Sequence, residues 1–264
     1  MGTANLLLIS QRFNKTVKVQ KKIDKEMQDV FSDLPYEPLE DWRDPSLNTT
    51  KWTPVRSAMF YNNVHDYDNE TNILLLEYNA ELVIRNFETV QNHFRPHIRA
   101  DVIKVIQRYF HSLEAKSGHK LTFINIHVRR TDYINFLAKR FQGKTVDGKF
   151  FNYCIEEFLG EYPSAIFLVT SDDIEWCREH LKHDKVVFPE LKSEHNPMVT
   201  DFVLMTQVNH SIYDYGSFAF FGALLAGGKT MVADGYSGTT HKLLGAVKIW
   251  PPPGWKTVDI RNLS

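Results

Sequence analysis

The pattern of hydrophobic positions along this 264-residue chain changes near Gly118. Residues 121–128 form a run of β-branched and aromatic residues that is apolar on both faces, which is typical of a central parallel strand. Short apolar runs then alternate with segments of helical periodicity. We expect strands at 165–170, 185–188, 211–215 and 230–233, and helices at 150–158, 173–181, 199–207 and 217–226. This α/β alternation predicts a doubly wound parallel sheet with helices on both faces.

The pattern before residue 116 is less regular. Residues 15–29 are rich in charge and predict one surface helix, and four prolines interrupt the pattern between residues 35 and 54. From 73 to 113, apolar residues recur at helical spacing and predict helices. We therefore expect a mainly helical and irregular N-terminal region at 1–115 and a Rossmann-like lobe at 116–264.

The charge and cysteine content narrow the function classes. Lys plus Arg number 31 and Asp plus Glu 32, a formal net charge of −1, which argues against nucleic acid as a partner. Cys154 and Cys177 lie in no zinc-binding spacing, so we expect no structural metal. Two buried free thiols are favoured, and a disulfide between them stays open as an alternative.

The signals for compartment disagree with one another. Asn-x-Ser/Thr sequons begin at Asn14, Asn48, Asn69 and Asn209, and they point to a secretory compartment. Residues 1–10, however, contain only a short apolar run without a basic flank, and no apolar stretch reaches the ~18 residues of a membrane helix. The chain thus shows no signal peptide or anchor.

Candidate chemistry lies where the predicted strands end, because ligands of open α/β sheets bind beyond the carboxyl ends of the strands. The strand at 121–128 leads into Arg129, Arg130 and Asp132. Neighbouring arginines on an extended segment point to opposite faces. We therefore expect one of them to bind a phosphate with its planar fork and the other to brace the site through Asp132. The alternative is an Arg–Asp salt bridge at the surface.

Two further strand ends carry polar or glycine-containing turns. Ser171, Asp172 and Asp173 follow the second strand. Ser171 or Asp172 can cap the next helix, and a carboxylate there can accept hydrogen bonds from a nucleoside. Gly216 and Ser217 open the helix at 217–226, whose amides and dipole suit a diphosphate. An ordinary strand-to-helix turn is the alternative.

These same segments resemble a known family. The stretch HVRRTDY at 127–133 is similar to the signature of the α1,2-fucosyltransferases, which α1,6- and protein O-fucosyltransferases share more loosely. FLVTSDDIEWC at 167–177 and DFVLMTQVNHSI at 201–212 resemble the α1,2 branch, and GSF at 216–218 and LAGG at 225–228 continue the likeness. The resemblance covers residues 120–235. The family's region that precedes these motifs is matched only faintly, by Trp42 to Pro45 and by residues 80–94.

The resemblance implies an inverting glycosyltransferase of GT-B-like fold that needs no metal or other cofactor. Its donor substrate is GDP-fucose, and its partner is a glycan that ends in galactose, whose 2-hydroxyl receives L-fucose. Catalytic residues are expected at Arg129, on the donor β-phosphate, and at Asp132, as a candidate base. Residues for the donor are expected at His127, Arg129, Arg130, Ser171, Asp172, Asp173, Gly216, Ser217 and Phe218.

Within that scheme, His127 and Asp172 or Asp173 face the guanosine, and Ser217 and Phe218 bind the diphosphate. Family members also carry a membrane anchor and a glycine-rich first turn of the acceptor-side lobe, and neither stands in the printed sequence, so we expect a shortened or divergent N-terminal lobe. The family implies the Golgi lumen or membrane. A relative that binds a GDP-sugar or glycan without turnover, and an α/β enzyme for another phosphorylated substrate, are the alternative functions.

Overall fold

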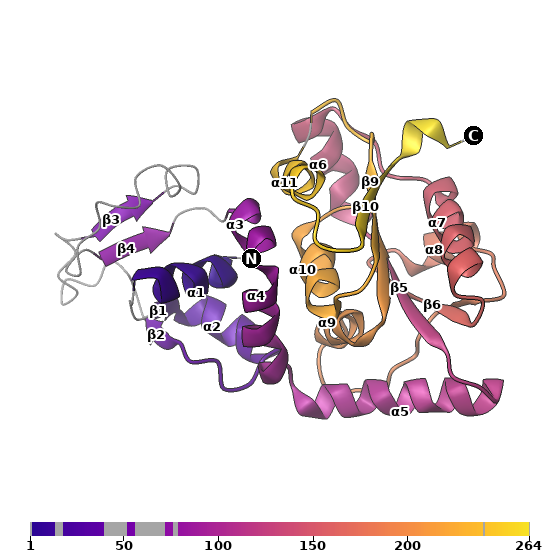
Figure 1. Ribbon diagram of the computed structural model, residues 1–264, viewed down its shortest axis with the longest axis horizontal. Coiled ribbons are helices and arrows are strands. Elements are labelled where there is room, and N and C mark those ends of the chain that lie inside the picture. Colours follow the sequence, from indigo (N-terminus) through magenta and orange to yellow (C-terminus); the bar gives the residue numbers. More distant parts are fainter. Residues whose placement is uncertain are drawn as a thin grey trace. The chain divides into compact units, whose positions relative to one another are not determined.

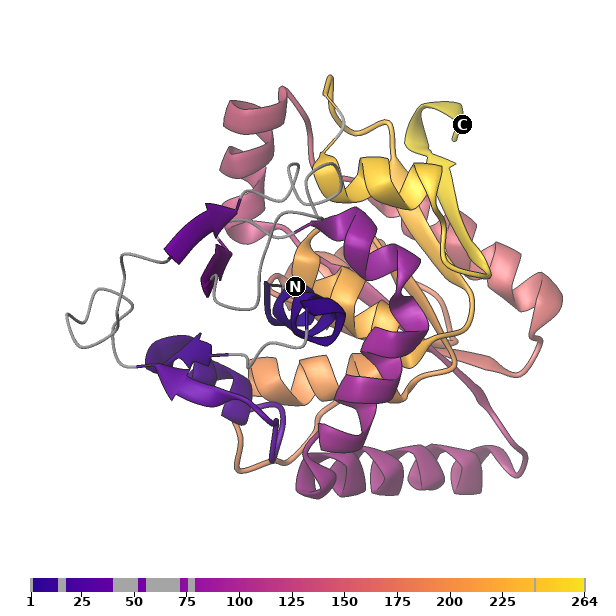
Figure 2. The same cartoon turned by 60° about the vertical axis from the view of Figure 1, so that its left-hand side comes forward.

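The structure is a computed structural model that describes residues 2–13, 18–39, 52–55, 72–75, 79–239 and 241–263. It divides into two compact units, Met1–Ile98 and Arg99–Ser264. The boundary lies before helix α5 (Ala100–Ser117), whereas the sequence pattern placed it after residue 115. Helix α5 packs against helix α9 (Pro197–Gln207) and so belongs to the second unit. Both helices can be followed in Figure 2.

The first unit consists of short helices and two small parallel strand pairs. Its elements are α1 (Gly2–Phe13), β1 (Lys18–Gln20), α2 (Lys21–Gln28), β2 (Glu37–Leu39), β3 (Trp52–Val55), β4 (Asn72–Leu75), α3 (Ala80–Arg85), α4 (Phe87–Phe94) and η3 (Arg95–His97). Strand β1 pairs with β2 and β3 with β4. The single helix expected at 15–29 is thus wrong in part, because a strand occupies 18–20. The sequons at Asn14, Asn48 and Asn69, and Trp42 with its neighbours, lie outside the described residues.

The second unit contains the parallel sheet that the alternating pattern predicted. Its strands are β5 (Thr122–Val128), β6 (Ala165–Ser171), β7 (Val186–Val187), β8 (His210–Tyr213), β9 (Thr230–Asp234) and β10 (Trp255–Asp259). Their order is β10-β9-β8-β5-β6-β7, and every pair is parallel. The Rossmann-like fold class is therefore confirmed.

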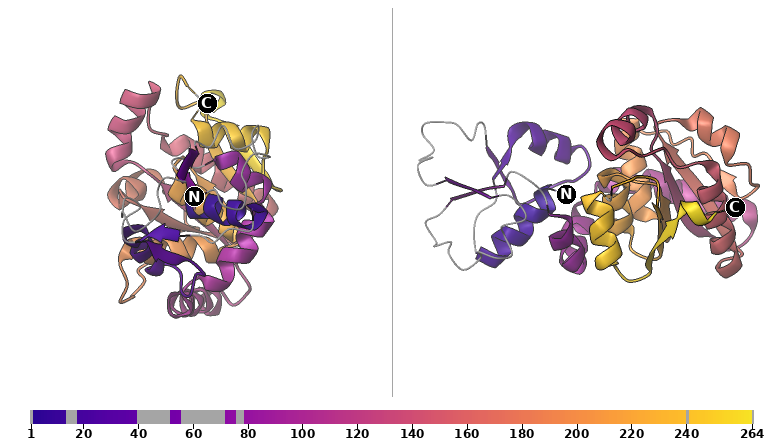
Figure 3. Two further views of the ribbon diagram at one scale, coloured as in Figure 1. Left: turned by 90° about the vertical axis from the view of Figure 1, so that its left-hand side faces the viewer. Right: turned by 90° about the horizontal axis from the view of Figure 1, so that it is seen from above.

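Helices cover both faces of this sheet, as Figures 1 and 3 show. They are α6 (Thr131–Phe141), α7 (Gly148–Glu161), α8 (Ile174–His180), α9, α10 (Ser217–Ala226) and α11 (Lys242–Ile249), followed by the 3-10 turn η4 (Ile260–Asn262). Helices α7 and α8 lie on one face, and α9, α10 and α11 lie on the other. The strand order reverses between β5 and β8, so this is the switch point where a doubly wound sheet opens a crevice for a ligand.

The interior of the second unit is mainly apolar. Ile124, Ile126 and Phe167 have no solvent exposure, and α10 buries seven of its residues from Ala219 to Leu225. Burial of this kind stabilises the fold by about 1.5–3 kcal/mol for each large side chain. Cys154 and Cys177 are buried free thiols, so the disulfide alternative is excluded.

Two further observations bear on the sequence expectations. The Asn209 side-chain oxygen accepts the backbone N–H of Phe123 at 2.8 Å, and Ser211 of the same sequon is buried in β8. Asn209 itself is exposed in the bend before β8, and its side chain is bonded to the first strand of the sheet. Among the described helices, none has the length and apolar character to cross a membrane.

Candidate active site

A cavity of about 530 Å³ lies at the carboxyl ends of β5, β6 and β8. Seven of the predicted site residues line it: His127, Arg129, Ser171, Asp172, Gly216, Ser217 and Phe218. The strand end at Arg129 and the helix start at Ser217 therefore face one space, although 88 positions separate them in the chain. The remaining three predicted residues, Arg130, Asp132 and Asp173, do not line the cavity.

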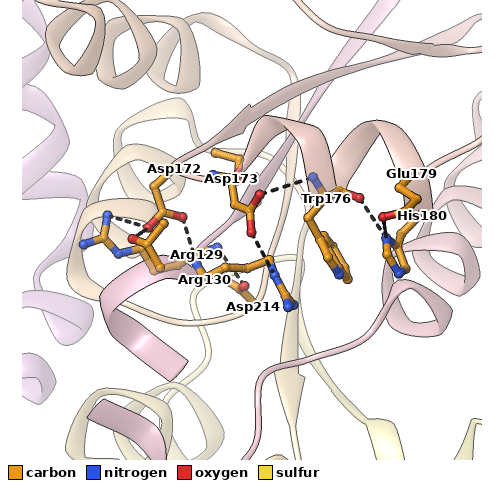
Figure 4. A network of polar contacts seen from close by, with 10 residues as sticks. Arg129, Arg130, Asp172, Asp173, Trp176, Glu179, His180 and Asp214 are labelled. Carbon is orange, nitrogen blue, oxygen red and sulfur yellow. Dashed lines mark hydrogen bonds and ion pairs between the residues drawn. The ribbon is translucent and has the colours of Figure 1, made fainter. Parts of the chain in front are cut away.

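Two carboxylates hold the end of β5 from opposite sides (Figure 4). Arg129 donates its backbone N–H to Asp214 Oδ2 at 2.8 Å, and Arg130 donates its own to Asp172 Oδ1 at 2.8 Å. Consecutive N–H groups of an extended chain point to opposite neighbours, so the first reaches the β8 side and the second the β6 side. The direction in which Arg129 leaves the sheet is thereby fixed.

The Arg129 guanidinium is held by carboxylates and remains partly accessible. Its Nη2 lies 2.7 Å from Asp132 Oδ1, its Nη1 lies 3.4 Å from Asp172 Oδ2, and the side chain is 37% exposed. Carboxylates and phosphates offer the same bidentate oxygen geometry to an arginine fork. The position can therefore take a phosphate in exchange for the exposed Asp132.

The second arginine has a different environment. Arg130 Nε lies 3.4 Å from Asp173 Oδ2, and the guanidinium stacks 4.0 Å from the centre of the Trp176 ring. Asp132 therefore pairs with Arg129 and not with Arg130, which is the Arg–Asp salt bridge that stood as the alternative. Because Arg130 is mostly buried against α8, it supports the strand end from behind.

Asp172 and Asp173 are both engaged within the fold. Asp172 accepts hydrogen bonds from the Arg130 N–H and the Thr131 hydroxyl. Burial opposes its ionisation, but these bonds and the charge of Arg129 hold the pKa of Asp172 below its usual value. Asp173 caps α8 by accepting the Trp176 N–H at 3.2 Å. The expected cap, Ser171 or Asp172, is therefore wrong, because α8 begins one residue later and Asp173 caps it. Contact of either carboxylate with a guanosine stays a prediction.

Gly216, Ser217 and Phe218 at the start of α10 line the cavity. Gly216 has φ +98° and turns the chain from β8 into the helix, and no described side chain caps this end. Behind the turn, the Tyr215 ring stacks on Tyr133 with centroids 4.6 Å apart and planes 9° apart. An open helix N-terminus in a rigid setting is suited to an anion.

His127 forms an uncharged part of the cavity wall. It is 6% exposed, its Nδ1 lies 3.1 Å from Thr170 Oγ1, and its ring lies 5.5 Å from that of Phe218. Burial lowers the pKa of His127 to about 4, so the imidazole is neutral at pH 7. It can offer a hydrogen bond and a flat surface but no charge.

Sequence reasoning missed two carboxylates at this site. Asp201 of α9 lines the cavity, and burial raises its pKa to about 6. The signal was present, since Asp201 is a lone charge in a helix in which seven of the eleven residues are buried. Asp214 is 1% exposed and follows β8 directly before the glycine turn. Its role depends on the neighbouring strand and left no local pattern.

The described residues contain no group of three or more His, Cys, Asp or Glu side chains that is arranged to hold a metal ion. The acidic side chains at the strand ends are instead paired with arginines or with backbone N–H groups. The cations at this site are guanidinium groups of the chain itself.

Fold and site together define an α/β enzyme lobe with a site for an anionic ligand at its switch point. A model of glycosyl transferase family 11 matches residues 78–237, more than half of the chain. The chain belongs to this family, and the resemblance drawn from its motifs is confirmed.

Curated relatives agree with this assignment. The chain is 34% identical over 143 residues to galactoside alpha-(1,2)-fucosyltransferase 2 of Pongo pygmaeus, covering 53% of this chain and 40% of the relative. It is 32% identical over 181 residues to galactoside alpha-(1,2)-fucosyltransferase 1 of Sus scrofa, covering 65% and 48%. The aligned parts thus span less than half of these relatives.

Among solved structures, a mutant of the Arabidopsis thaliana FUT1 protein in complex with GDP is 14% identical to this chain, with a TM-score of 0.44, and covers 88% of this chain and 67% of that one. This likeness is too distant to bear on the site.

Proposed function

We propose that this protein transfers L-fucose from GDP-fucose to the 2-hydroxyl of a terminal galactose, with inversion at the sugar carbon. The observation that carries the proposal is the convergence of Arg129 and the open N-terminus of α10 on one cavity at the sheet's switch point. The family assignment and the names of the relatives supply the donor and the acceptor.

The diphosphate of the donor binds between Arg129 and the amides at Ser217 and Phe218. When the bond from fucose to the β-phosphate breaks, negative charge develops on the departing GDP. A guanidinium and a helix N-terminus aimed at that charge stabilise it in a site partly shielded from water. In this proposal they take the place of a divalent ion, and the reaction needs no metal or other cofactor.

The guanine lies toward Asp201 and His127. Guanine presents two adjacent N–H donors, and an ionised carboxylate can accept both. Asp201 lines the cavity and is the carboxylate there that makes neither an ion pair nor a strand-end hydrogen bond among those described above. The neutral imidazole of His127 and the ring of Phe218 supply apolar surface beside it.

Asp132 stays the predicted base for the acceptor hydroxyl. Its carboxylate is 67% exposed and holds Arg129 in this structure. It becomes available for a proton only after a phosphate has replaced it on the guanidinium. Binding of the donor therefore precedes any role of Asp132 in catalysis.

The direct experiment incubates the protein with labelled GDP-fucose and lactose, with and without EDTA. We expect fucosylated lactose in both samples and loss of product with Arg129→Ala. Product that disappears with EDTA contradicts the metal-free mechanism. GDP binding without transfer to lactose or to longer galactose-terminated glycans selects the alternative of a binding protein without turnover.

A further inference from the structure

Asp214 is a buried carboxylate that lies between the two proposed anion-binding elements without lining the cavity. It is 1% exposed and stands between β8 and the glycine turn that opens α10. One oxygen accepts the Arg129 N–H at 2.8 Å, and the other accepts the Tyr215 N–H at 2.7 Å. A single side chain thus bonds the backbone of both elements.

The register of the sheet explains why a side chain is needed there. The pairing of β5 with β8 ends at His127 opposite Tyr213. Beyond that pair the two chains separate, because β5 continues into α6 and β8 turns into α10. Asp214 accepts the N–H of Arg129 and so extends the connection between the two chains past the end of the ladder.

A buried carboxylate at position 214 lowers the stability of the folded protein. Burial raises the pKa of Asp214 well above its usual value, and the nearby charge of Asp172 acts in the same direction. Backbone N–H groups offset part of this cost, because a carboxylate can accept one hydrogen bond on each oxygen. An asparagine offers one acceptor oxygen and one donor nitrogen, so it cannot accept both N–H groups in this geometry.

We propose that Asp214 is a positioning residue that fixes the Arg129 strand end and the mouth of α10 at the separation that a diphosphate requires. The proposal rests on the proposed function, since it assumes that both elements bind the diphosphate of a GDP-sugar. It assigns to Asp214 no contact with substrate. Its effect passes through the two backbone N–H groups that it holds.

The test compares GDP with GMP by titration calorimetry in the wild-type protein and in Asp214→Asn. GMP has one phosphate and cannot connect the two elements, so we expect the wild type to prefer GDP by about tenfold or more. Asp214→Asn should lose most of that preference, with the loss falling on GDP. Asp214→Ser is a second variant and should behave in the same way, because its shorter side chain has a single oxygen in place of the two that accept the N–H groups.

The control for a general loss of stability is Asp147→Ala. Asp147 also accepts a backbone N–H, from Lys149 at 3.0 Å, but it caps α7 away from the cavity. This variant should retain the preference for GDP over GMP even where its melting temperature falls. Ratios of the two affinities are compared in samples that show a cooperative thermal transition.

The outcomes separate this proposal from the function on which it rests. If the wild type prefers GDP and both Asp214 variants fold and keep the preference, the positioning role is wrong and the donor site stands. If the wild type binds neither nucleotide, the proposed function fails and the role of Asp214 fails with it.

Discussion

Arg129 is the residue on which binding of a diphosphate depends most. Its guanidinium is held by Asp132 and Asp172 in this structure, and each of these partners can share it with an incoming phosphate. Removing the guanidinium eliminates a charge-assisted contact and leaves two carboxylates near the phosphate site. The phosphate therefore loses an attractive contact and is also repelled by the two carboxylates.

For Arg129→Ala we expect the Kd for GDP to rise by about 10–100-fold, which corresponds to about 1.5–3 kcal/mol for a hydrogen bond to a charged group. Titration calorimetry measures this Kd. The matched control is Arg178→Ala, because the Arg178 guanidinium stacks 4.5 Å from the centre of the Phe188 ring and does not line the cavity. Equal affinities for Arg129→Ala and the wild type remove Arg129 from the donor site.

Asp201 illustrates a conflict between stability and function. Burial raises its pKa to about 6. In the unfolded chain the carboxyl ionises near pH 4, whereas in the folded protein it keeps its proton up to about pH 6. The folded state binds more protons in that window, so Asp201 lowers stability as the pH rises through it.

For Asp201→Asn we expect a free energy of unfolding about 1–3 kcal/mol higher at pH 7.5, no gain below about pH 4, and weaker GDP binding. Denaturant unfolding at both pH values and calorimetry with GDP measure these effects. Met198→Leu changes a neighbouring cavity residue without a titrating group and should show no such pH dependence. Lower stability of Asp201→Asn at pH 7.5 contradicts the account.

At the scale of elements, the turn into α10 depends on backbone geometry. Gly216 has φ +98° and ψ 151°, a region that residues with a Cβ adopt only with strain. A Cβ built there meets only the Tyr133 hydroxyl, at 4.0 Å, so the cost of a side chain lies in the backbone and not in a clash. The direction of the α10 amides therefore depends on the backbone conformation at Gly216.

For Gly216→Ala we expect a stability loss of about 1–3 kcal/mol and weaker GDP binding, because the α10 amides shift. The control is Gly118→Ala at the end of α5, where φ is +74° and nothing lies within 4 Å of a new Cβ. It should lower stability and leave GDP affinity unchanged. Thermal melts measure the stability of both variants, and calorimetry measures their affinity for GDP. Retained GDP affinity in Gly216→Ala argues against the α10 site.

The elements differ in how well their sequences predict them. Helix α10 begins and ends at the predicted residues because glycines with positive φ, Gly216 and Gly227, flank an apolar run. Helix α6 was not predicted, although Tyr133, Leu137 and Phe141 recur at helical spacing and Leu137 is buried. The sequence left open which arginine Asp132 would contact, and the start of α6 places Asp132 beside Arg129.

At the scale of the whole molecule, the second unit contains the six-stranded sheet and, among the described residues, those that line the cavity. The parallel sheet and the strand ends of the site could be predicted from sequence, because apolar runs and turn residues are local signals. The unit boundary, and the roles of Asp201 and Asp214, could not, because they depend on which helices and strands pack together.

We expect residues 99–264 produced alone to unfold cooperatively and to bind GDP with an affinity within about threefold of the full chain, because compact units with their own core fold independently. Circular dichroism melts and calorimetry measure this. A fragment without a cooperative transition contradicts independent folding of the second unit. A fragment that folds and does not bind GDP shows that the first unit is needed for donor binding.

The account depends most on the claim that Arg129 and the start of α10 hold one diphosphate, and a crystal structure of the protein with GDP tests it directly. We expect phosphate oxygens within hydrogen-bond distance of both the Arg129 guanidinium and the backbone amides at Ser217 and Phe218, with Asp132 displaced from the arginine. GDP bound outside this cavity, or phosphates that contact neither group, contradicts the account.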